Sequence, residues 1–358
     1  MKNENSQMNL PIIRVANLAG KRVLLRADLD VPLQTVTDGQ PSVITDDLRL
    51  KASLETINYL LQKTPKVIVC GHLGRPKAED KSLTLEITAN WYSKQFKKQP
   101  TRVKVGSFDG WEIGEKLVLL ENLRFNAGEE VNDLGFAKNL ASLADVYVND
   151  AFGSSHREHA SIVGVPSLLP HFAGLHLQKE VEELSGVLKN PKRPLCIIIA
   201  GAKIETKLPL ISKMHHFADF VLVGGELAEH DKELISIQHE KISGQKSVVL
   251  VADLLENQKD ITPHSIENFI QIIRGSKTVV WNGPLGVVEE EDFTKGTIMI
   301  AQAITDSPNI YSIAGGGDLS GFLNKQGMLS KLSFVSTGGG AMLEFLSGEE
   351  LPGLIALI

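Results

Sequence analysis

The 358-residue sequence contains only two cysteines and no apolar run that approaches the ~20 residues of a transmembrane helix. Cys70 and Cys196 each lie in a short apolar run, which predicts buried, reduced thiols rather than disulfide partners. The first seven residues lack the apolar core of a secretory signal peptide. These absences exclude a bundle of membrane helices and lead us to expect a cytoplasmic protein.

An excess of positive charge is also absent. The formal net charge is −6, and hydrophobic and charged residues make up 42% and 22% of the chain, as in ordinary globular proteins. Residues 1–175 contain 21 Lys and Arg against 20 Asp and Glu, whereas residues 176–358 contain 16 against 23. Neither half has the strongly cationic surface that nucleic acid binding usually requires, so we expect no nucleic acid partner.

Short runs of β-branched residues alternate with longer segments of helical spacing. The expected strands are residues 22–26, 66–70, 116–120, 145–148, 195–199, 220–223, 247–251, 278–281 and 310–314. Several of them are apolar throughout, as in a parallel sheet covered on both faces, and helices are expected between them, for example over 46–62, 135–144 and 293–304. Because a domain has ~150 residues, length and alternation together predict an α/β protein with two doubly wound, Rossmann-like parallel sheets.

The segment around residues 170–192 is predicted to join the two domains. It opens at Pro170, continues with helical spacing and closes at the breaker Asn190-Pro-Lys-Arg-Pro194. A helix between two sheets suits a hinge. We therefore expect an N-terminal domain over residues 1–172, a hinge helix over 173–192 and a C-terminal domain over 193–341.

Ligands of open α/β sheets bind outside the carboxyl ends of the strands, so the residues after each expected strand are site candidates. In the first half these loops supply charged side chains, and Arg49 opens a helix nearby; the set is His72, Arg75, Arg124, His156 and Arg157. Planar guanidinium groups bind phosphate and carboxylate through paired hydrogen bonds. The first half therefore predicts a site for a small polyanion.

In the second half the corresponding loops are mostly glycine. They are residues 201–203, 224–225, 282–286, 315–318 and 336–340. Glycine lets successive N–H groups face one anion and lets a nucleotide approach the main chain. Asp318 follows three glycines and is a candidate Mg²⁺ ligand, because proteins usually hold this ion with few carboxylates plus phosphate oxygens. These loops predict a nucleotide site.

With these motifs the sequence closely resembles the phosphoglycerate kinase family, in the family's order and over nearly the whole chain. The matching segments are residues 21–28, 44–49, 71–77, 119–125, 148–153, 200–203, 280–284, 315–318 and 336–341. The resemblance implies a hinge-bending monomeric enzyme that transfers a phosphoryl group between 1,3-bisphosphoglycerate and ADP, giving 3-phosphoglycerate and Mg-ATP. It also implies that residues from about 342 to 358 return to the N-terminal domain.

The resemblance assigns roles in the N-terminal domain. Arg75, Arg124 and Arg157 match the positions that hold the phosphate of phosphoglycerate. Positions around its carboxylate and hydroxyl are matched by Asp28, Arg49 and His72, and Asp30 is a further expected substrate ligand.

In the C-terminal domain, Lys203 and Lys207 match the cations that act with Arg49 on the transferring group. Glu289 is the expected ribose contact, and Asp318 matches the residue that positions Mg²⁺. The implied nucleotide positions are Gly201, Ala202, Lys207, Gly224, Gly225, Asn282, Gly283, Leu285, Glu289, Gly315, Gly316, Gly317 and Asp318.

The chemistry of this reaction agrees with such a residue set. Transfer from an acyl phosphate requires no general base, because a carboxylate oxygen is already a competent nucleophile. Catalysis then consists of positioning and of neutralising charge on the transferred group. Asp28 and Asp30 are accordingly interpreted as substrate ligands rather than an acid–base pair, and the two domains are expected to close to exclude water.

The sequence departs from the family pattern in three respects. Asp30 stands where the family usually has Asn, which can donate a hydrogen bond as well as accept one. Glu226 follows Gly224-Gly225 in place of a third glycine, and Leu319 stands where a hydroxyl is usual. The stretch from Gly225 to Asn282 is also shorter than usual. These differences are expected to affect nucleotide affinity and the choice of base.

The sequence is also compatible with two other functions. A phosphoglycerate-kinase-like binding protein with weak or lost turnover or altered nucleotide preference would also carry these motifs. Gly315-x-Gly317-x-x-x-Gly321 superficially suggests a dinucleotide-dependent dehydrogenase, but too little chain follows it to complete such a sheet, and no P-loop motif occurs. His156 and His159 make a poor metal pair without further ligands.

Overall fold

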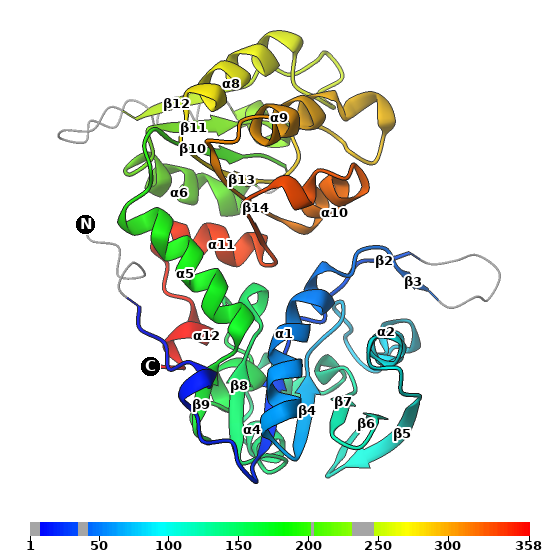
Figure 1. Ribbon diagram of the computed structural model, residues 1–358. Coiled ribbons are helices and arrows are strands. Elements are labelled where there is room, and N and C mark those ends of the chain that lie inside the picture. Colours follow the sequence, from blue (N-terminus) through cyan, green and yellow to red (C-terminus); the bar gives the residue numbers. More distant parts are fainter. Residues whose placement is uncertain (1–7, 35–41, 202–203, 231–246) are drawn as a thin grey trace. The chain divides into compact units, whose positions relative to one another are not determined.

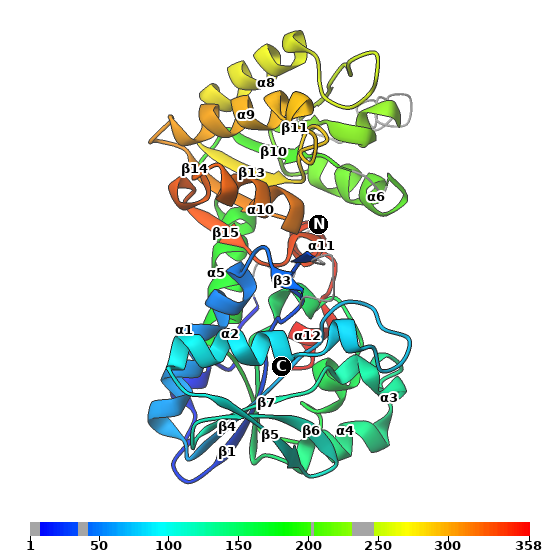
Figure 2. The same ribbon diagram turned by 90° about the vertical axis from the view of Figure 1, so that its right-hand side faces the viewer.

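The computed structural model describes residues 8–34, 42–201, 204–230 and 247–358. It is an α/β protein whose described chain divides into two compact units (Figures 1 and 2). The N-terminal unit comprises Asn9–Glu182 and Glu350–Ile358, and the C-terminal unit comprises Glu183–Glu349. The predicted class, two doubly wound parallel-sheet domains, is confirmed.

The N-terminal unit is built on a seven-stranded sheet with the order β5-β6-β7-β4-β1-β8-β9. Its strands are β1 (Arg22–Arg26), β4 (Lys66–Cys70), β5 (Pro100–Val105), β6 (Phe108–Ile113), β7 (Leu117–Leu120), β8 (Val146–Asn149) and β9 (His171–Ala173), and β2 (Leu33–Gln34) and β3 (Val43–Ile44) form a separate pair. Its helices are α1 (Leu48–Lys63), α2 (Glu86–Phe96), α3 (Ala127–Glu130), α4 (Leu134–Ala141), α12 (Pro352–Ile355), the π-helix η6 (Ala160–Gly164) and the 3-10 helices η2 (Ile13–Val15), η3 (Lys81–Leu83), η4 (Leu123–Phe125) and η5 (Phe152–Ser154).

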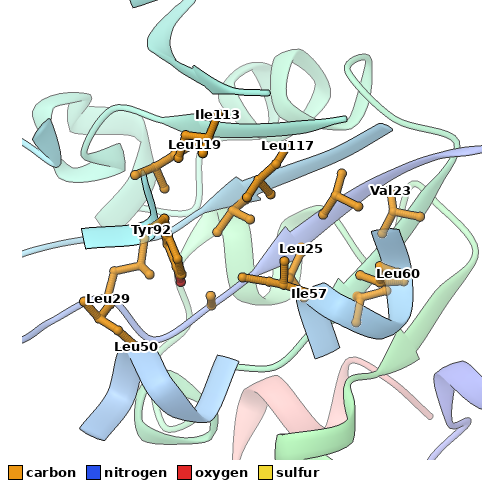
Figure 3. Packing of buried hydrophobic residues seen from close by; sticks show 14 of the residues in the cluster. Val23, Leu25, Leu29, Leu50, Ile57, Leu60, Tyr92, Ile113, Leu117 and Leu119 are labelled. Carbon is orange, nitrogen blue, oxygen red and sulfur yellow. The ribbon is translucent and has the colours of Figure 1, made fainter. Parts of the chain in front are cut away.

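One face of this sheet carries the main apolar core. Alternate residues of β1, Val23 and Leu25, pack with Leu50 and Ile57 of α1 and with Tyr92 of α2 (Figure 3). Because side chains along a strand alternate between the two faces, the neighbouring positions of β1 are directed to the opposite face. That opposite face receives a charged residue, as described below.

The C-terminal unit has a six-stranded, fully parallel sheet with the order β12-β11-β10-β13-β14-β15. The strands are β10 (Leu195–Ile199), β11 (Phe220–Val223), β12 (Val248–Val251), β13 (Thr278–Asn282), β14 (Tyr311–Gly315) and β15 (Phe334–Ser336). The helices are α6 (Ile204–His215), α8 (Pro263–Gly275), α9 (Lys295–Thr305), α10 (Gly317–Lys325), α11 (Gly339–Leu346) and the 3-10 helices η7 (Gly225–His230), η8 (Glu291–Phe293) and η9 (Leu329–Lys331). Figure 2 shows α8 and α9 on one face of this sheet and α6 on the other.

The strands expected from apolar runs occur within one residue of the expected bounds. The β2–β3 pair, the β5–β6 hairpin, β9 and β15 were not expected. In β5, Thr101, Arg102 and Lys104 are exposed and no residue is buried, so this edge strand has no apolar run to mark it.

The connection between the units is α5 (Leu175–Lys189), and the boundary between them falls within it, between Glu182 and Glu183. The segment expected to return to the first domain, residues 342–358, is divided at Glu349. Glu350–Ile358 belong to the N-terminal unit, where the Gly353 N–H donates to the Ser155 carbonyl at 2.8 Å. The preceding residues, with α11, belong to the C-terminal unit.

Candidate active site

Each sheet has one point at which the chain reverses its direction of travel across the strands. In the N-terminal unit the chain proceeds from β1 through β4 to β7 on one side and from β8 to β9 on the other, so the reversal lies between β1 and β8. In the C-terminal unit it lies between β10 and β13. Ligands of doubly wound sheets bind outside the carboxyl ends of the strands at such a switch point. Each unit therefore offers one candidate half-site.

The loop after β1 brings two carboxylates to the guanidinium of Arg49. Arg49 Nε lies 3.9 Å from Asp28 Oδ2, and Arg49 Nη1 lies 3.6 Å from Asp30 Oδ2 and donates to the Asp30 carbonyl. Asp28 is buried, and its carboxylate is the main cause of the raised pKa of Arg49. Asp30 Oδ1 also accepts the Gly74 N–H at 2.8 Å. The ion pairs of Arg49 thus link α1 to the loop after β1, and the hydrogen bond of Asp30 links that loop to the loop after β4.

Arg124 extends this cluster from the loop after β7. Its Nη1 donates to the Gly74 carbonyl at 2.6 Å, and its Nε lies 3.0 Å from Glu130 Oε1. The side chain is almost fully buried, and its Nη2 has no hydrogen-bond partner among the described residues. A buried N–H group without a partner is costly, so this atom is a donor poised for an anionic ligand. Burial lowers the pKa of the Arg124 guanidinium.

Three histidines among the arginines have lowered pKa values. Burial first, and then the charges of Arg26 and Arg124, keep the pKa of His72 well below its usual range. Burial and Arg124 lower the pKa of His159 to about 3, and burial and Arg157 lower that of His156. The charges that suppress protonation of these rings are those of a site with positive potential.

The remaining predicted residues of this half-site differ in exposure. Arg157 is half-buried after η5, and its charge acts on both His72 and Arg124. Arg75 is exposed in the loop after β4. Asp28, Asp30, Arg49, His72 and Arg124 are joined by contacts within 4 Å, directly or through Gly74.

Replacing Asp30 by asparagine is expected to lower the KM for an anionic substrate of this site about three- to tenfold. The carboxylate competes with a substrate oxygen for Arg49 and adds charge beside an anion, and one unit charge at ~4 Å is worth more than a kcal/mol near a surface. The amide can still accept the Gly74 N–H. Steady-state kinetics with the anionic substrate that the resemblance implies measure the effect, and Glu55→Gln, an exposed carboxylate of α1, is the control. An unchanged or raised KM for Asp30→Asn would contradict this expectation.

The glycine loops of the C-terminal unit approach one another at the β10/β13 switch point. Gly283 has φ +84°, and a Cβ there would lie 2.2 Å from the Ala200 carbonyl oxygen. A Cβ on Gly225, where φ is +64°, would lie 2.6 Å from the Gly201 nitrogen. Only glycine fits such contacts without displacing backbone. The loops after β10, β11 and β13 are therefore close enough to line one site with main-chain groups.

A second set of contacts joins the loops after β13, β14 and β15. Asn282 Nδ2 donates to the Gly315 carbonyl at 3.0 Å and to the Gly339 carbonyl at 3.1 Å. Gly316 has φ +112°, and a Cβ on Gly339 would lie 2.5 Å from the Gly316 nitrogen and Cα. Asn282 is buried, and these bonds use its amide as a fixed brace between loops. The amide of Asn282 thus has a structural role, and its contact with a nucleotide stays a prediction.

Of the two lysines predicted to bind phosphate, Lys207 lies within the described residues. Lys207 lies in the first turns of α6, and its Nζ donates to the Ala200 carbonyl at 2.7 Å, beside Gly201. Ala202 and Lys203 lie outside the described residues. Lys207 therefore stands at the carboxyl end of β10, where a nucleotide phosphate is expected.

The other predicted nucleotide residues take distinct positions. Leu285 is fully buried, and its N–H donates to Thr297 Oγ1 at 3.0 Å. Glu289 and Asp318 are exposed, and Asp318 lies in the first turn of α10. Leu319 is buried, so the apolar residue at the usual hydroxyl position belongs to the core of this unit, whereas Glu226 is exposed.

No group of three or more His, Cys, Asp or Glu that could hold a metal occurs among the described residues. The exposed carboxylate of Asp318 fits a cation that arrives with a phosphate ligand, which needs few protein ligands. In the described part of the chain, no helix has both the length and the hydrophobicity to cross a membrane.

Sequence reasoning missed Arg26, Glu129 and Ser161. Arg26 ends β1 and is fully buried on the face opposite the main core, where it donates to Ser161 and His72. An arginine at a strand end gives no sign of burial by itself. The one signal was that Arg26 directly follows the apolar residues Val23, Leu24 and Leu25 at the end of the expected strand.

Two parallel-sheet domains, one with a buried cationic half-site and one with a glycine-lined half-site, define a two-domain α/β phosphotransferase. The model of the phosphoglycerate kinase family matches residues 13–259 and 234–349. A phosphoglycerate kinase from Dictyoglomus turgidum is 39% identical over an alignment of 393 positions, which covers 96% of this chain and 97% of the relative. This chain belongs to the phosphoglycerate kinase family, and it is an enzyme of the kinase class.

Solved structures of the family superpose on the chain. The phosphoglycerate kinase of Coxiella burnetii gives a TM-score of 0.80 at 33% identity, covering 98% of this chain and 99% of that one. That of Pyrococcus horikoshii OT3 gives 0.79 at 30% identity, covering 97% and 98%. Nothing in these matches supports the alternative of a binding protein without turnover.

Proposed function

We propose that this chain transfers a phosphoryl group between 1,3-bisphosphoglycerate and Mg-ADP, giving 3-phosphoglycerate and Mg-ATP, with the N-terminal unit binding phosphoglycerate and the C-terminal unit binding nucleotide. The observation that carries the proposal is Arg124 Nη2, a buried donor without a partner among the described residues, in a cluster where burial and arginine charges lower the pKa of three histidines. Guanidinium groups bind phosphate through paired, charge-assisted hydrogen bonds, so a buried donor of this kind suits a phosphate group.

In this mechanism, Arg75, Arg124 and Arg157 hold the substrate phosphate. Arg49, held by the carboxylates of Asp28 and Asp30, presents its guanidinium group to the carboxyl end of the substrate and to the transferring group. Since the attacking oxygen is already a carboxylate, no proton has to move, and the protein contributes orientation and positive charge. The reaction itself requires the two bound substrates to meet in line with water excluded.

On the nucleotide side, main-chain N–H groups of the loops at Gly201, Gly225 and Gly283 bind phosphate oxygens, and Lys207 adds a cation. Mg²⁺, held by Asp318 and the nucleotide phosphates, would supply neutralisation of phosphate charge when bound. Lys203 is assigned with Lys207 by family resemblance alone. The exposed Glu289 is available to a ribose hydroxyl.

A coupled assay with purified protein tests the proposal directly. We expect turnover of 3-phosphoglycerate that depends on Mg²⁺ and ATP, and a parallel series with GTP measures base preference, which the exposed Glu226 and the shortened stretch after Gly225 affect. Binding of 3-phosphoglycerate by calorimetry without nucleotide-dependent turnover would overturn the catalytic assignment and leave a binding protein.

Replacing Asp318 by alanine is expected to raise the KM for Mg-ATP about tenfold or more, because a metal-bound phosphate loses its one protein carboxylate. Binding of 3-phosphoglycerate, measured by calorimetry, should stay within about twofold of wild type, because Asp318 belongs to the C-terminal unit. Asp306→Ala, an exposed aspartate at the end of α9, is the matched control. Normal metal dependence of the Asp318→Ala variant would remove Asp318 from the metal site.

We further propose that the protein acts as a monomer in the cytoplasm. The proposal for the compartment is supported by the two cysteines, which are free and buried, as in proteins of reducing compartments. Sedimentation of the purified protein at several concentrations tests the oligomeric state.

A further inference from the structure

A continuous row of buried polar side chains leads away from the phosphoglycerate half-site. Arg26 Nη2 lies 2.8 Å from His72 Nδ1, and Arg26 Nε donates to Ser161 Oγ at 2.8 Å. Ser161 donates in turn to both oxygens of Glu129, from Oγ at 2.5 Å and from its N–H at 3.0 Å. The four residues come from β1, the loop after β4, η6 and α3, which the fold alone brings together.

The two charges in this row are deeply buried and compensate each other through Ser161. Arg26 and Glu129 are fully buried. Burial raises the pKa of Glu129, while the charge of Arg26 and the hydrogen bonds from Ser161 lower it. An unpaired charge at this depth would be very unfavourable, so Arg26 stays where Ser161 and Glu129 hold it.

The contact between Arg26 and His72 determines where the imidazole carries its proton. A guanidinium nitrogen can only donate, so His72 Nδ1 must accept. A neutral imidazole with an accepting Nδ1 carries its proton on Nε2. Its Nε2 lies 3.9 Å from Asp30 Oδ2, too far for a hydrogen bond, and therefore remains a donor for a ligand oxygen near Asp30 and Arg49.

We propose that Ser161 and Glu129 are positioning residues for phosphoglycerate binding: they hold Arg26, and Arg26 fixes His72 as a neutral donor whose Nε2–H faces the substrate. The nature of the ligand rests on the proposed function, whereas the relay itself rests on the contacts described. Ser161 and Glu129 touch no substrate in this mechanism and act only through Arg26 and His72.

The relay makes a spectroscopic prediction for the unaltered protein. In full-length protein labelled with ¹⁵N-histidine, the His72 ring should show one accepting nitrogen at Nδ1 and one protonated nitrogen at Nε2 from pH 8 down to pH 6. The His72→Gln variant assigns these signals by their loss. A protonated Nδ1, or titration of the ring above pH 6, would overturn the proposal whether or not the protein turns over substrate.

Ser161→Ala removes the Arg26 acceptor and one donor to Glu129 with little change in volume. We expect a second tautomer of His72 and a KM for 3-phosphoglycerate raised about tenfold, the effect of one weakened hydrogen bond to a charged group. The KM for ATP should stay within about twofold and kcat within about threefold, because the nucleotide site lies in the other unit.

The matched control is Ser53→Ala, another buried serine of the N-terminal unit, whose hydroxyl bonds Leu50 and Tyr92 at 2.7 Å each. It should match Ser161→Ala in loss of thermal stability but leave the His72 signals and both KM values unchanged. Equal KM effects in the two variants would reduce Ser161 to a structural residue and refute the relay.

Glu129→Gln provides a second variant, because the amide still accepts from Ser161 but carries no charge. A smaller rise in the KM for 3-phosphoglycerate, about three- to fivefold, is expected together with partial change of the His72 signals.

If kinetics fail altogether while His72 shows the expected tautomer, the proposed function fails and the relay stands. Normal kinetics with unchanged His72 signals in both variants would refute the relay and leave the function intact.

Discussion

Replacing Arg49 by alanine is expected to lower kcat about 10³-fold, the scale on which an arginine that meets a transferring phosphoryl group acts. Arg49 stands at the start of α1 and is fixed by Asp28 at 3.9 Å and Asp30 at 3.6 Å, so its orientation is set before substrate arrives. A group fixed in this way contributes most where charge develops, in the transition state. The KM for ATP should change less than about threefold, as measured by steady-state kinetics.

Two further substitutions separate charge from geometry. Arg49→Lys keeps the charge but loses the planar fork, so an intermediate loss of about 10- to 10²-fold in kcat is expected. Arg22→Ala is the matched control, because Arg22 lies at the other end of β1 and pairs with Asp145 at 3.0 Å. It should leave kcat within about twofold of wild type.

The Arg49→Ala variant also loses stability, because it leaves Asp28 buried without its nearest described cation. About 1–3 kcal/mol is expected from the uncompensated charge, which thermal unfolding measures. Equal losses in kcat and in nucleotide affinity would contradict a transition-state role. A stability loss without a kinetic one would make Arg49 a structural counter-ion of Asp28.

The sequence was sufficient for the central strands and for the residues at their carboxyl ends. Each central strand is an apolar run, because both of its faces are covered, and topology makes the polar residue that ends the run a candidate site residue. Asp28 after β1, His72 after β4 and Asn282 at the end of β13 were predicted in this way, and the structure places them at the carboxyl ends of these strands. The edge hairpin β5–β6 has no such run, and it was missed.

What the sequence could not provide was the depth and the direction of individual side chains. Leu319 stands where the family usually has a hydroxyl, and α10 directs it into the core, which only the helix phase decides. Arg26 was missed because its burial depends on Ser161 and Glu129, which lie more than a hundred residues further along the chain. Long-range pairing of this kind leaves no local pattern.

Replacing Gly283 by alanine is expected to weaken nucleotide binding about 10²-fold. The backbone of Gly283 has φ +84°, and the added Cβ would lie 2.2 Å from the Ala200 carbonyl oxygen and 2.7 Å from its carbon. The backbone of Ala200 cannot yield easily, because its N–H is bonded to the Asn282 carbonyl at 2.8 Å. The clash must therefore separate the loops after β10 and β13, which are the two sides of the proposed phosphate site.

Gly327→Ala isolates the part of this effect that comes from the backbone conformation alone. Gly327 has φ +67°, but a Cβ there meets nothing within 4 Å, so only the strain of about 1–2 kcal/mol for a left-handed alanine is expected. Gly283→Ala should lose about 1–3 kcal/mol beyond this through overpacking. Calorimetry with ATP and thermal unfolding measure both effects.

The N-terminal unit provides the internal control for Gly283→Ala. Binding of 3-phosphoglycerate should remain within about twofold of wild type, because the arginine half-site is built from other strands and another core. Loss of ATP binding with retained phosphoglycerate binding would place the nucleotide phosphates between the loops of β10 and β13. If Gly283→Ala and Gly327→Ala bound ATP equally well, close approach of these loops would have no part in nucleotide recognition, and phosphate binding would rest on Lys207 and the loop before α10.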